Sequence, residues 1–416
     1  MSSARTAPTL ASELEPFDPT DLLTRCAAAQ LSPDNAQRLL RFEHLAINAA
    51  SRPPEPGRPC MSGSRYRRLL EGGMGVAHLE DPFSAPFAVA VAFTGGSYLV
   101  LPGLTEHLRP GIDLLLSAAM LAGELDGTRF RDVIAHPCQA LLRLSDAMCS
   151  KAGLKRGQAP VSEPKLVLPV GVRLEELTRA IAWSDTQIRE LISGTTLSPT
   201  ALHPFELPLG TRLPPDTAPG YGPLLQGPLV RDGQSVVIAL PHGLLTALSR
   251  FVLDAAHDHG VLKPLADAFH SASVTAASRC LDLMGLPERA DEGTPQPSVP
   301  GIAEQFRWLD TDKLLHVIVV TDDLATYTRA DPFGEGAFPS GAVLDGCFRS
   351  GLERARMRKS PPREVLGLLI TCGVSRHAMI GMNGGSEDQQ VLETVSELHS
   401  NRLQPGADKH AGGEIM

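Results

Sequence analysis

Aromatic residues are scarce in this sequence: Phe, Trp and Tyr make up 5% of its 416 residues, with only two Trp and four Tyr. Hydrophobic residues nevertheless reach 43% and charged residues 20%, which is typical of globular proteins. The cores must therefore depend on Leu, Val and Ala. At roughly 100–200 residues per domain, the length predicts about two to three domains.

Cysteine pairs with the spacing of zinc ligands are absent. The seven cysteines include no CxxC and no CxC pair, which argues against a zinc site built on cysteine pairs. Their number is odd, and several lie in apolar stretches with helical spacing. We therefore expect reduced, buried thiols in a cytoplasmic protein.

The sequence also lacks three other features: an apolar run long enough to span a membrane, a signal peptide and an excess of basic residues. The longest apolar runs, such as 87–93, have about a third of the ~20 residues that a membrane-spanning helix needs. Residues 1–19 contain no apolar stretch flanked by positive charge, which argues against a signal peptide. The net charge of −9 argues against nucleic acid as a partner, because binding to phosphates usually requires a basic excess. We expect no membrane association.

The common motifs of nucleotide and hydrolase sites are also absent. The sequence contains no GxxxxGK[ST], no GxSxG and no HExxH. No complete catalytic set of residues can therefore be assigned from motifs.

The apolar pattern predicts an α/β protein. Two hairpins are expected, at 87–101 with its turn at Gly95-Gly96 and at 228–240, each followed by an apolar helix. The two hairpin–helix units, which form an α+β N-terminal part, indicate either an internal duplication or two uses of a common arrangement. Further along the chain, apolar strands at 314–320 and 364–371 flank a helix at 341–359. This order predicts a βαβ unit with parallel strands.

A helix at 262–284 is expected to bury one apolar face. Its members, at helical spacing, are Leu265, Phe269, Ala272, Ala276, Cys280 and Leu283.

The predicted domain organisation follows the Pro-rich and polar connectors. It comprises a disordered segment (1–18), a small helical unit (19–59), a hairpin–helix domain (60–156), a second hairpin–helix domain (157–286), a linker (287–303), the βαβ domain (304–403) and a disordered tail (404–416).

The first candidate site lies at the end of the two parallel strands. Asp322 and Asp323 follow the first strand, and Cys372 ends the second, with His377 just beyond. Parallel strands bring these ends to one edge of the sheet, where ligands often bind. Two carboxylates could bind Mg²⁺ or Mn²⁺, and Cys or His could act as nucleophile or base. The alternative is that these are turn, cap and core residues.

The second candidate is a helix-turn-helix at 174–192. In this interpretation Thr186, Gln187 and Arg189 would face a major groove of DNA. Several glutamates stand where phosphates would lie, which favours the alternative of two packed helices without a DNA role.

Several segments resemble, in their order, a family of large uncharacterised bacterial proteins from GC-rich genomes. These segments are Glu80–Pro82 to Leu101–Gly103, His203–Phe205, Gly227–Val230, Leu240–Leu245, His316–Asp323 and Asp331–Phe333. The resemblance spans about 75–385, and its motifs are structural. It implies no catalytic residues, and it implies that the chain is one part of a longer protein or of a larger system.

Three functions follow as hypotheses. The first is an accessory protein of a bacterial multi-component system, such as defence, that binds a protein partner or forms a homo-oligomer. The second is a metal-dependent hydrolase, a phosphoesterase or nuclease, that uses Asp322 and Asp323. The third is a DNA-binding regulator that uses the helix-turn-helix.

Overall fold

The protein is described by a computed structural model. The described residues are 10–71, 87–101, 108–122, 124–125, 128–154, 166–167, 169, 171–213, 223–286, 299, 301–329, 339, 341–358 and 361–373.

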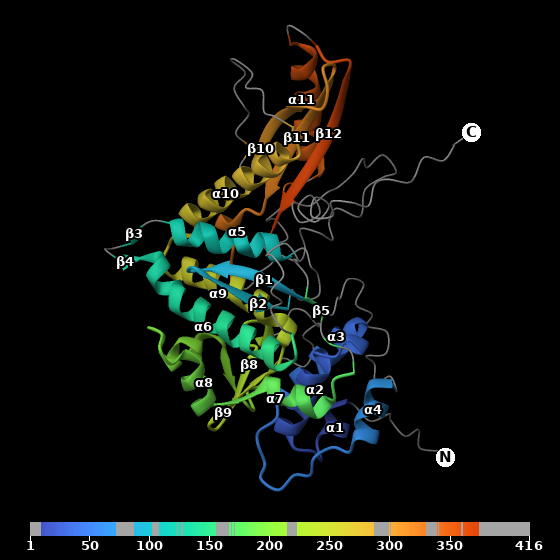
Figure 1. Ribbon diagram of the computed structural model, residues 1–416, viewed down its shortest axis with the longest axis vertical. Helices are drawn as coiled ribbons and strands as arrows, with labels where there is room; N and C mark the ends of the chain where they lie inside the picture. The colour runs from blue at the N-terminus through green and yellow to red at the C-terminus, as the bar shows by residue number, and fades with distance from the viewer. Residues whose placement is uncertain are drawn as a thin grey trace, which may run out of the picture. The chain divides into compact units, whose positions relative to one another are not determined.

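The chain is an α/β protein that forms two structural units (Figure 1). The α-helices are α1 (Leu10–Leu14), α2 (Pro19–Gln30), α3 (Leu39–Ala50), α4 (Gly63–Glu71), α5 (Leu108–Leu121), α6 (Phe130–Lys151), α7 (Leu174–Ile181), α8 (Asp185–Ile192), α9 (Leu244–Asp258), α10 (Leu262–Leu283) and α11 (Gly341–Arg356). Short 3₁₀ helices are η1 (Pro33–Arg38), η2 (Pro199–Phe205), η3 (Pro223–Leu225), η4 (Pro241–Gly243) and η5 (Leu324–Thr326).

The longest described strands are the last two, near the end of the chain. They are β1 (Phe87–Phe93), β2 (Gly96–Val100), β3 (Glu124–Leu125), β4 (Thr128–Arg129), β5 (Leu166–Val167), β6 (Ala182–Ser184), β7 (Glu206–Pro208), β8 (Leu229–Asp232), β9 (Ser235–Ile238), β10 (Ile302–Trp308), β11 (Lys313–Thr321) and β12 (Glu364–Cys372).

The first unit contains the described residues up to 109, those of 128–158 and those of 165–255. It holds two sheets, with strand orders β2-β1-β5 and β6-β9-β8-β7. Both predicted hairpins are confirmed, because β1 pairs with β2 and β8 with β9 in antiparallel register. Within the described residues, no helix is long and apolar enough to cross a membrane.

The N-terminal segment differs from the prediction of disorder over 1–18. Helix α1 lies within this segment, and the side chain of Leu14 is buried. Arg52 donates hydrogen bonds to the backbone oxygens of Leu14, Glu15 and Phe17. These bonds satisfy carbonyl groups at the end of a helix that is too short to be stable alone.

The turn of the first hairpin lies one residue earlier than predicted. Phe93 pairs with Gly96, so Thr94 and Gly95 are the central residues, with φ values of 46° and 76°. Positive φ at both positions is the geometry of a type I′ turn, which favours Asn followed by Gly. A β-branched residue is strained in this conformation.

Replacing Thr94 by Asn should therefore stabilise the first unit by about 0.5–1 kcal/mol. Urea unfolding can be followed by the fluorescence of Trp183 in a Trp308→Phe background. Thr94→Ala is the control, because it removes the branch but retains the left-handed conformation. Equal stability of the Asn and Ala variants would contradict the turn assignment.

A buried histidine of η4 and a glutamine of α2 connect α2 with the segment that follows β9. Nε2 of His242 lies 3.1 Å from the backbone oxygen of Gln30, to which it donates, and Nε2 of Gln30 donates to the backbone oxygen of Ala239 at 3.1 Å. Burial lowers the pKa of His242 from 6.5 to about 4, although its hydrogen bond to Gln30 acts in the opposite direction. The ring is therefore neutral at pH 7.

This histidine predicts a loss of stability in mild acid. As the pH falls from 6.5 towards 4, the unfolded chain binds a proton that the folded chain does not bind. The lost stability should reach about 3 kcal/mol at pH 4, and it should be fully restored above pH 6.5. In a Trp308→Phe background, His242→Gln, whose amide can donate to the same carbonyl, should reduce the pH dependence of unfolding in this window. An unchanged slope would contradict the assignment.

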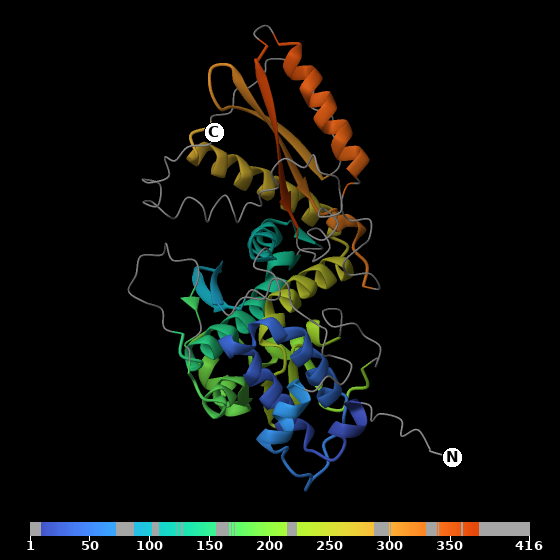
Figure 2. The ribbon, with the colours of Figure 1, turned by 90° about the vertical axis from the view of Figure 1, so that its right-hand side faces the viewer.

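The second unit contains the described residues of 110–127 and those from 256 onward. Its sheet has the order β10-β11-β12, with β11 antiparallel to β10 and parallel to β12. The predicted βαβ unit is thereby confirmed. The strand β10 is additional, and it begins inside the predicted linker at 287–303. Helices α10 and α11 cover opposite faces of this sheet (Figure 2).

Each face of the sheet has its own apolar core. The core under α10 consists of Ala277, Leu281, Leu315, Val317, Val319, Leu368, Ile370 and Cys372. The core under α11 consists of Ile302, Ile318, Val320, Leu344 and Cys347. Because both faces are covered, β11 and β12 are almost continuously apolar.

Polar residues of β10 are buried on both sides of the sheet. On the α11 side, Oε2 of Glu304 lies 2.8 Å from Nε2 of His316 and accepts a second hydrogen bond from Arg354. On the α10 side, the guanidinium of Arg307 is fully buried and pairs with the carboxylate of Asp282. These partners satisfy charges whose burial would otherwise cost several kcal/mol.

Candidate functional site

The parallel strands bring the predicted acidic and thiol groups together. Thr321 pairs with Cys372 in the register of β11 and β12, and the backbone nitrogen of Asp322 donates to the backbone oxygen of Cys372 at 3.3 Å. The sequence predicted this arrangement at one edge of the sheet. His377, the fourth predicted member, lies outside the described residues.

Helix α10 contributes two further polar side chains at this edge. Nδ1 of His270 lies 2.9 Å from Oγ1 of Thr321, and the buried side chain of Ser273 lies near Cys372. Neither residue was predicted from the sequence. Their spacing of three on one helix was the available signal, because such residues share a face.

The thiol of Cys372 is held in its neutral form. The pKa of this thiol is raised to about 12, mainly by burial and also by the nearby Asp322 and Cys280, while the side chain of Ser273 acts in the opposite direction. A thiol with this pKa is a poor nucleophile at pH 7, because the thiolate is the reactive species. Partial burial lowers the pKa of His270, against a smaller effect of Asp267, so this ring is neutral at pH 7.

The two predicted carboxylates have different surroundings. The side chain of Asp322 is buried, with 3% exposed. Asp323 is more exposed, and its Oδ1 accepts a hydrogen bond from the backbone nitrogen of Ala325 at 3.2 Å, which caps η5. Among the described residues, no group of three or more His, Cys, Asp or Glu side chains could bind a metal ion. The geometry is that of a capped strand end rather than a formed metal centre.

The predicted helix-turn-helix requires a correction. Helices α7 and α8 are present, but strand β6 connects them and pairs with β9. Thr186, Gln187 and Arg189 are exposed on α8, where Gln187 forms a capping box with Ser184. The connection between the two helices is therefore a paired strand instead of the predicted turn, and DNA binding by this segment stays a prediction.

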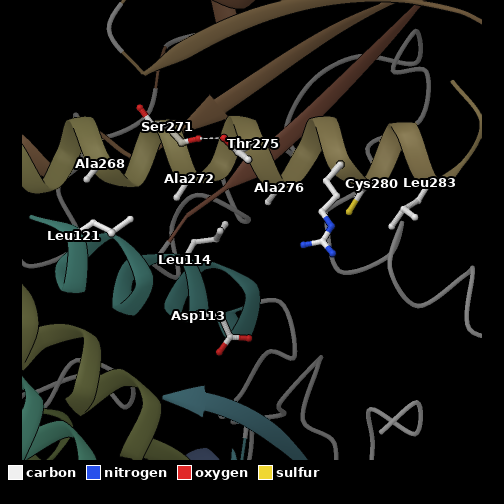
Figure 3. Close-up of a pocket in the computed structure, with 11 residues that line it drawn as sticks. Asp113, Leu114, Leu121, Ala268, Ser271, Ala272, Thr275, Ala276, Cys280 and Leu283 are labelled. Carbon is white, nitrogen blue, oxygen red and sulfur yellow. Dashed lines mark hydrogen bonds between the residues drawn. The ribbon is translucent and has the colours of Figure 1, made fainter. Parts of the chain in front are cut away.

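The second unit also contains a groove between α5 and α10, with a volume of about 770 Å³ (Figure 3). Asp113, Leu114 and Leu121 of α5 line one side, and one face of α10 from Ala268 to Leu283 lines the other. The lining is mostly apolar, with the small side chains of α10 in its middle.

Two large apolar side chains of the groove are open to solvent. Leu121 is 77% exposed and Leu283 is 53% exposed. Among the large apolar side chains of the described residues, only Met357 is more exposed, at 83%. Figure 3 shows Leu121 near Ala268 and Leu283 at the opposite end of the helix face. Exposed apolar groups along one groove are typical of binding surfaces.

Comparison of the chain with protein-family models, with curated proteins and with solved structures gives no match.

Proposed function

We propose that this chain acts by binding a protein partner through the groove between α5 and α10. The observation that carries the proposal is the exposed apolar lining of this groove, with Leu121 and Leu283 at its two ends. Leaving such side chains in water is unfavourable, and covering them on association returns about 25 cal/mol per Å².

The shape of the groove suits a helix as the bound element. The lining face of α10 runs from Ala268 to Leu283, which is roughly 22 Å at 1.5 Å per residue. Its alanines allow the backbone of a second helix to approach closely, as in the recognition of an amphipathic helix by an apolar groove.

The setting that we propose is the cytoplasm of a bacterium, in a multi-component system such as defence. The seven cysteines form no disulfide, and a reducing compartment suits free thiols. The bacterial setting depends on the family resemblance described above.

A library of displayed helical peptides can test this function. Peptides selected on the full chain should lose at least tenfold in affinity when Leu283 is replaced by Asp. Met357→Asp is the matched control, because Met357 is the most exposed large apolar side chain of the described residues and directly follows α11, outside the groove. Failure to select any peptide, or equal binding to both variants, would argue against the groove as a binding surface.

A metal-dependent hydrolase is the second candidate function. The observation that favours it is the parallel register, which brings Asp322 beside Cys372 at a sheet edge where ligands often bind. Turnover of nucleotides or DNA should then require Mg²⁺ or Mn²⁺, and it should be lost in Asp322→Asn and Asp323→Asn variants that remain folded. Absence of turnover with either metal would rule against it.

A further inference from the structure

We infer that the partner presents an acidic amphipathic helix, with its apolar face along α10 and a carboxylate paired with Arg279. This inference rests on the proposed function and specifies the chemistry of the partner. Arg279 lines the groove on α10 and is exposed.

Arg279 is the charged group that the groove offers to a ligand. The other charged lining residue, Asp113, already takes part in an interaction of the chain, and one of its carboxylate oxygens is buried. Arg279 has no ion pair with another described residue. The guanidinium therefore gives the groove a positive end, although the whole chain carries a net charge of −9.

The other polar groups of the lining offer a partner few hydrogen bonds. Oγ1 of Thr275 donates to the backbone oxygen of Ser271 at 2.8 Å, as the dashed line in Figure 3 shows. This hydroxyl hydrogen is therefore already used within α10. An uncharged polar partner would gain fewer hydrogen bonds here than a carboxylate, which can accept two from one guanidinium.

The two features together define the sequence pattern of the partner. Apolar residues at helical spacing over about four turns would cover the alanines and contact Leu121 at one end and Leu283 at the other. A Glu or Asp beside this stripe, towards one end, would reach Arg279. A basic residue at that position would be repelled.

Charge exchange on the full chain tests this pattern directly. One peptide selected in the display experiment is synthesised in two forms, with Glu or with Lys at the position nearest Arg279. The Glu form should bind wild-type protein at least tenfold more tightly than the Lys form, and the preference should reverse for Arg279→Glu. Arg349→Glu is the control, because Arg349 is an exposed arginine of α11 outside the groove.

The possible outcomes separate this inference from the proposed function. Peptides that depend on Leu283 but are indifferent to the charge at position 279 would overturn the acidic helix and leave the protein-binding function intact. Loss of binding in Arg349→Glu as well would also overturn it, because the effect would then be one of overall charge. Palmitate, whose carboxylate and apolar chain could also fit the groove, is tested as a separate ligand. Binding of palmitate that depends on Arg279, without any peptide binding, would overturn both the acidic helix and the protein-binding function.

Discussion

Replacing Gly351 by Ala should lower the free energy of unfolding of the second unit by at least ~3 kcal/mol, at the upper end of the cost of overpacking a core. Gly351 lies on the face of α11 that packs on the sheet. A methyl group there would lie 1.9 Å from Cε1 of His316, well inside van der Waals contact.

The imidazole of His316 cannot move aside to relieve this overlap. It stacks on Phe306 with a centroid distance of 4.8 Å, and the edge of Phe348 lies against it at 5.5 Å. Its Nε2 is held by Glu304. The added methyl group must therefore displace α11 from the sheet.

A single fluorophore can report this effect. The chain has two tryptophans, so a Trp183→Phe background leaves Trp308 of β10 as the only one, and it lies in the second unit. Gly346→Ala is the matched control on the same helix, because a methyl group there has no neighbouring atom within 4 Å. It should stabilise the unit by about 0.5–1 kcal/mol. A loss of stability of similar size in both variants would contradict the proposed clash.

Removing the carboxylate of Glu304 should have a second large effect, with about 3–5 kcal/mol of stability lost in Glu304→Ala. The buried oxygen of this side chain accepts hydrogen bonds from His316 and Arg354. Without it, the guanidinium of Arg354 remains at the sheet without its counter-charge. The cost comes from that unpaired cation, since the pair itself contributes little net stability.

The control for Glu304 is a solvent-exposed pair of the same sheet. Nζ of Lys313 lies 3.1 Å from Oε2 of Glu364, with about half of each side chain exposed. Glu364→Ala should leave the urea midpoint of Trp308 fluorescence nearly unchanged, because water screens and replaces such pairs. Equal losses for the two glutamates would show that burial does not decide the effect.

The parallel strands could be predicted because their sequence has a simple physical cause. A strand covered by helices on both faces must be apolar at every position, and β11 reads KLLHVIVVT with eight of nine residues buried. Its one buried ionisable residue, His316, did not interrupt the pattern. The same parallel register places Asp322 near Cys372, so this proximity could also be predicted.

Strand β10 could not be predicted for the opposite reason. Its sequence, IAEQFRW, contains Glu304, Gln305 and Arg307, which resemble a solvated connector, yet all three are buried. Each is satisfied by a partner that is remote or only becomes adjacent on folding, such as Asp282 for Arg307. Sequence periodicity carries no information about such pairs.

In helix α10, the spacing of apolar residues did not distinguish the buried face from the face that lines the groove. The predicted buried face combined residues of two adjacent faces of the helix. In the structure Leu265, Phe269, Ser273, Ala277 and Leu281 are buried, whereas Ala272, Ala276, Cys280 and Leu283 line the groove. Both faces are apolar or small, so a helical period fits either one. The helix was therefore predicted correctly, but the groove along it was not.

Proline also limited the prediction of α6. An apolar helix was expected after the first hairpin, and α6 begins at Phe130, before the Pro137 that it contains. Proline usually ends a helix, because it lacks a donor and clashes with the preceding turn. Here Phe130 and Ile134 are fully buried, and this burial offsets the lost hydrogen bond.

The interleaved path of the chain sets an order for its assembly during synthesis. All described residues of the first unit have been synthesised once position 255 has left the ribosome. Residues 110–122 belong to the second unit, so they cannot pack there until its last strand, which ends at residue 372, has been synthesised. Leu114, which packs against the core under α10, stays without that core during this interval. A fragment cut at residue 256 would separate these segments permanently, so the second unit should be expressed only together with residues 110–122.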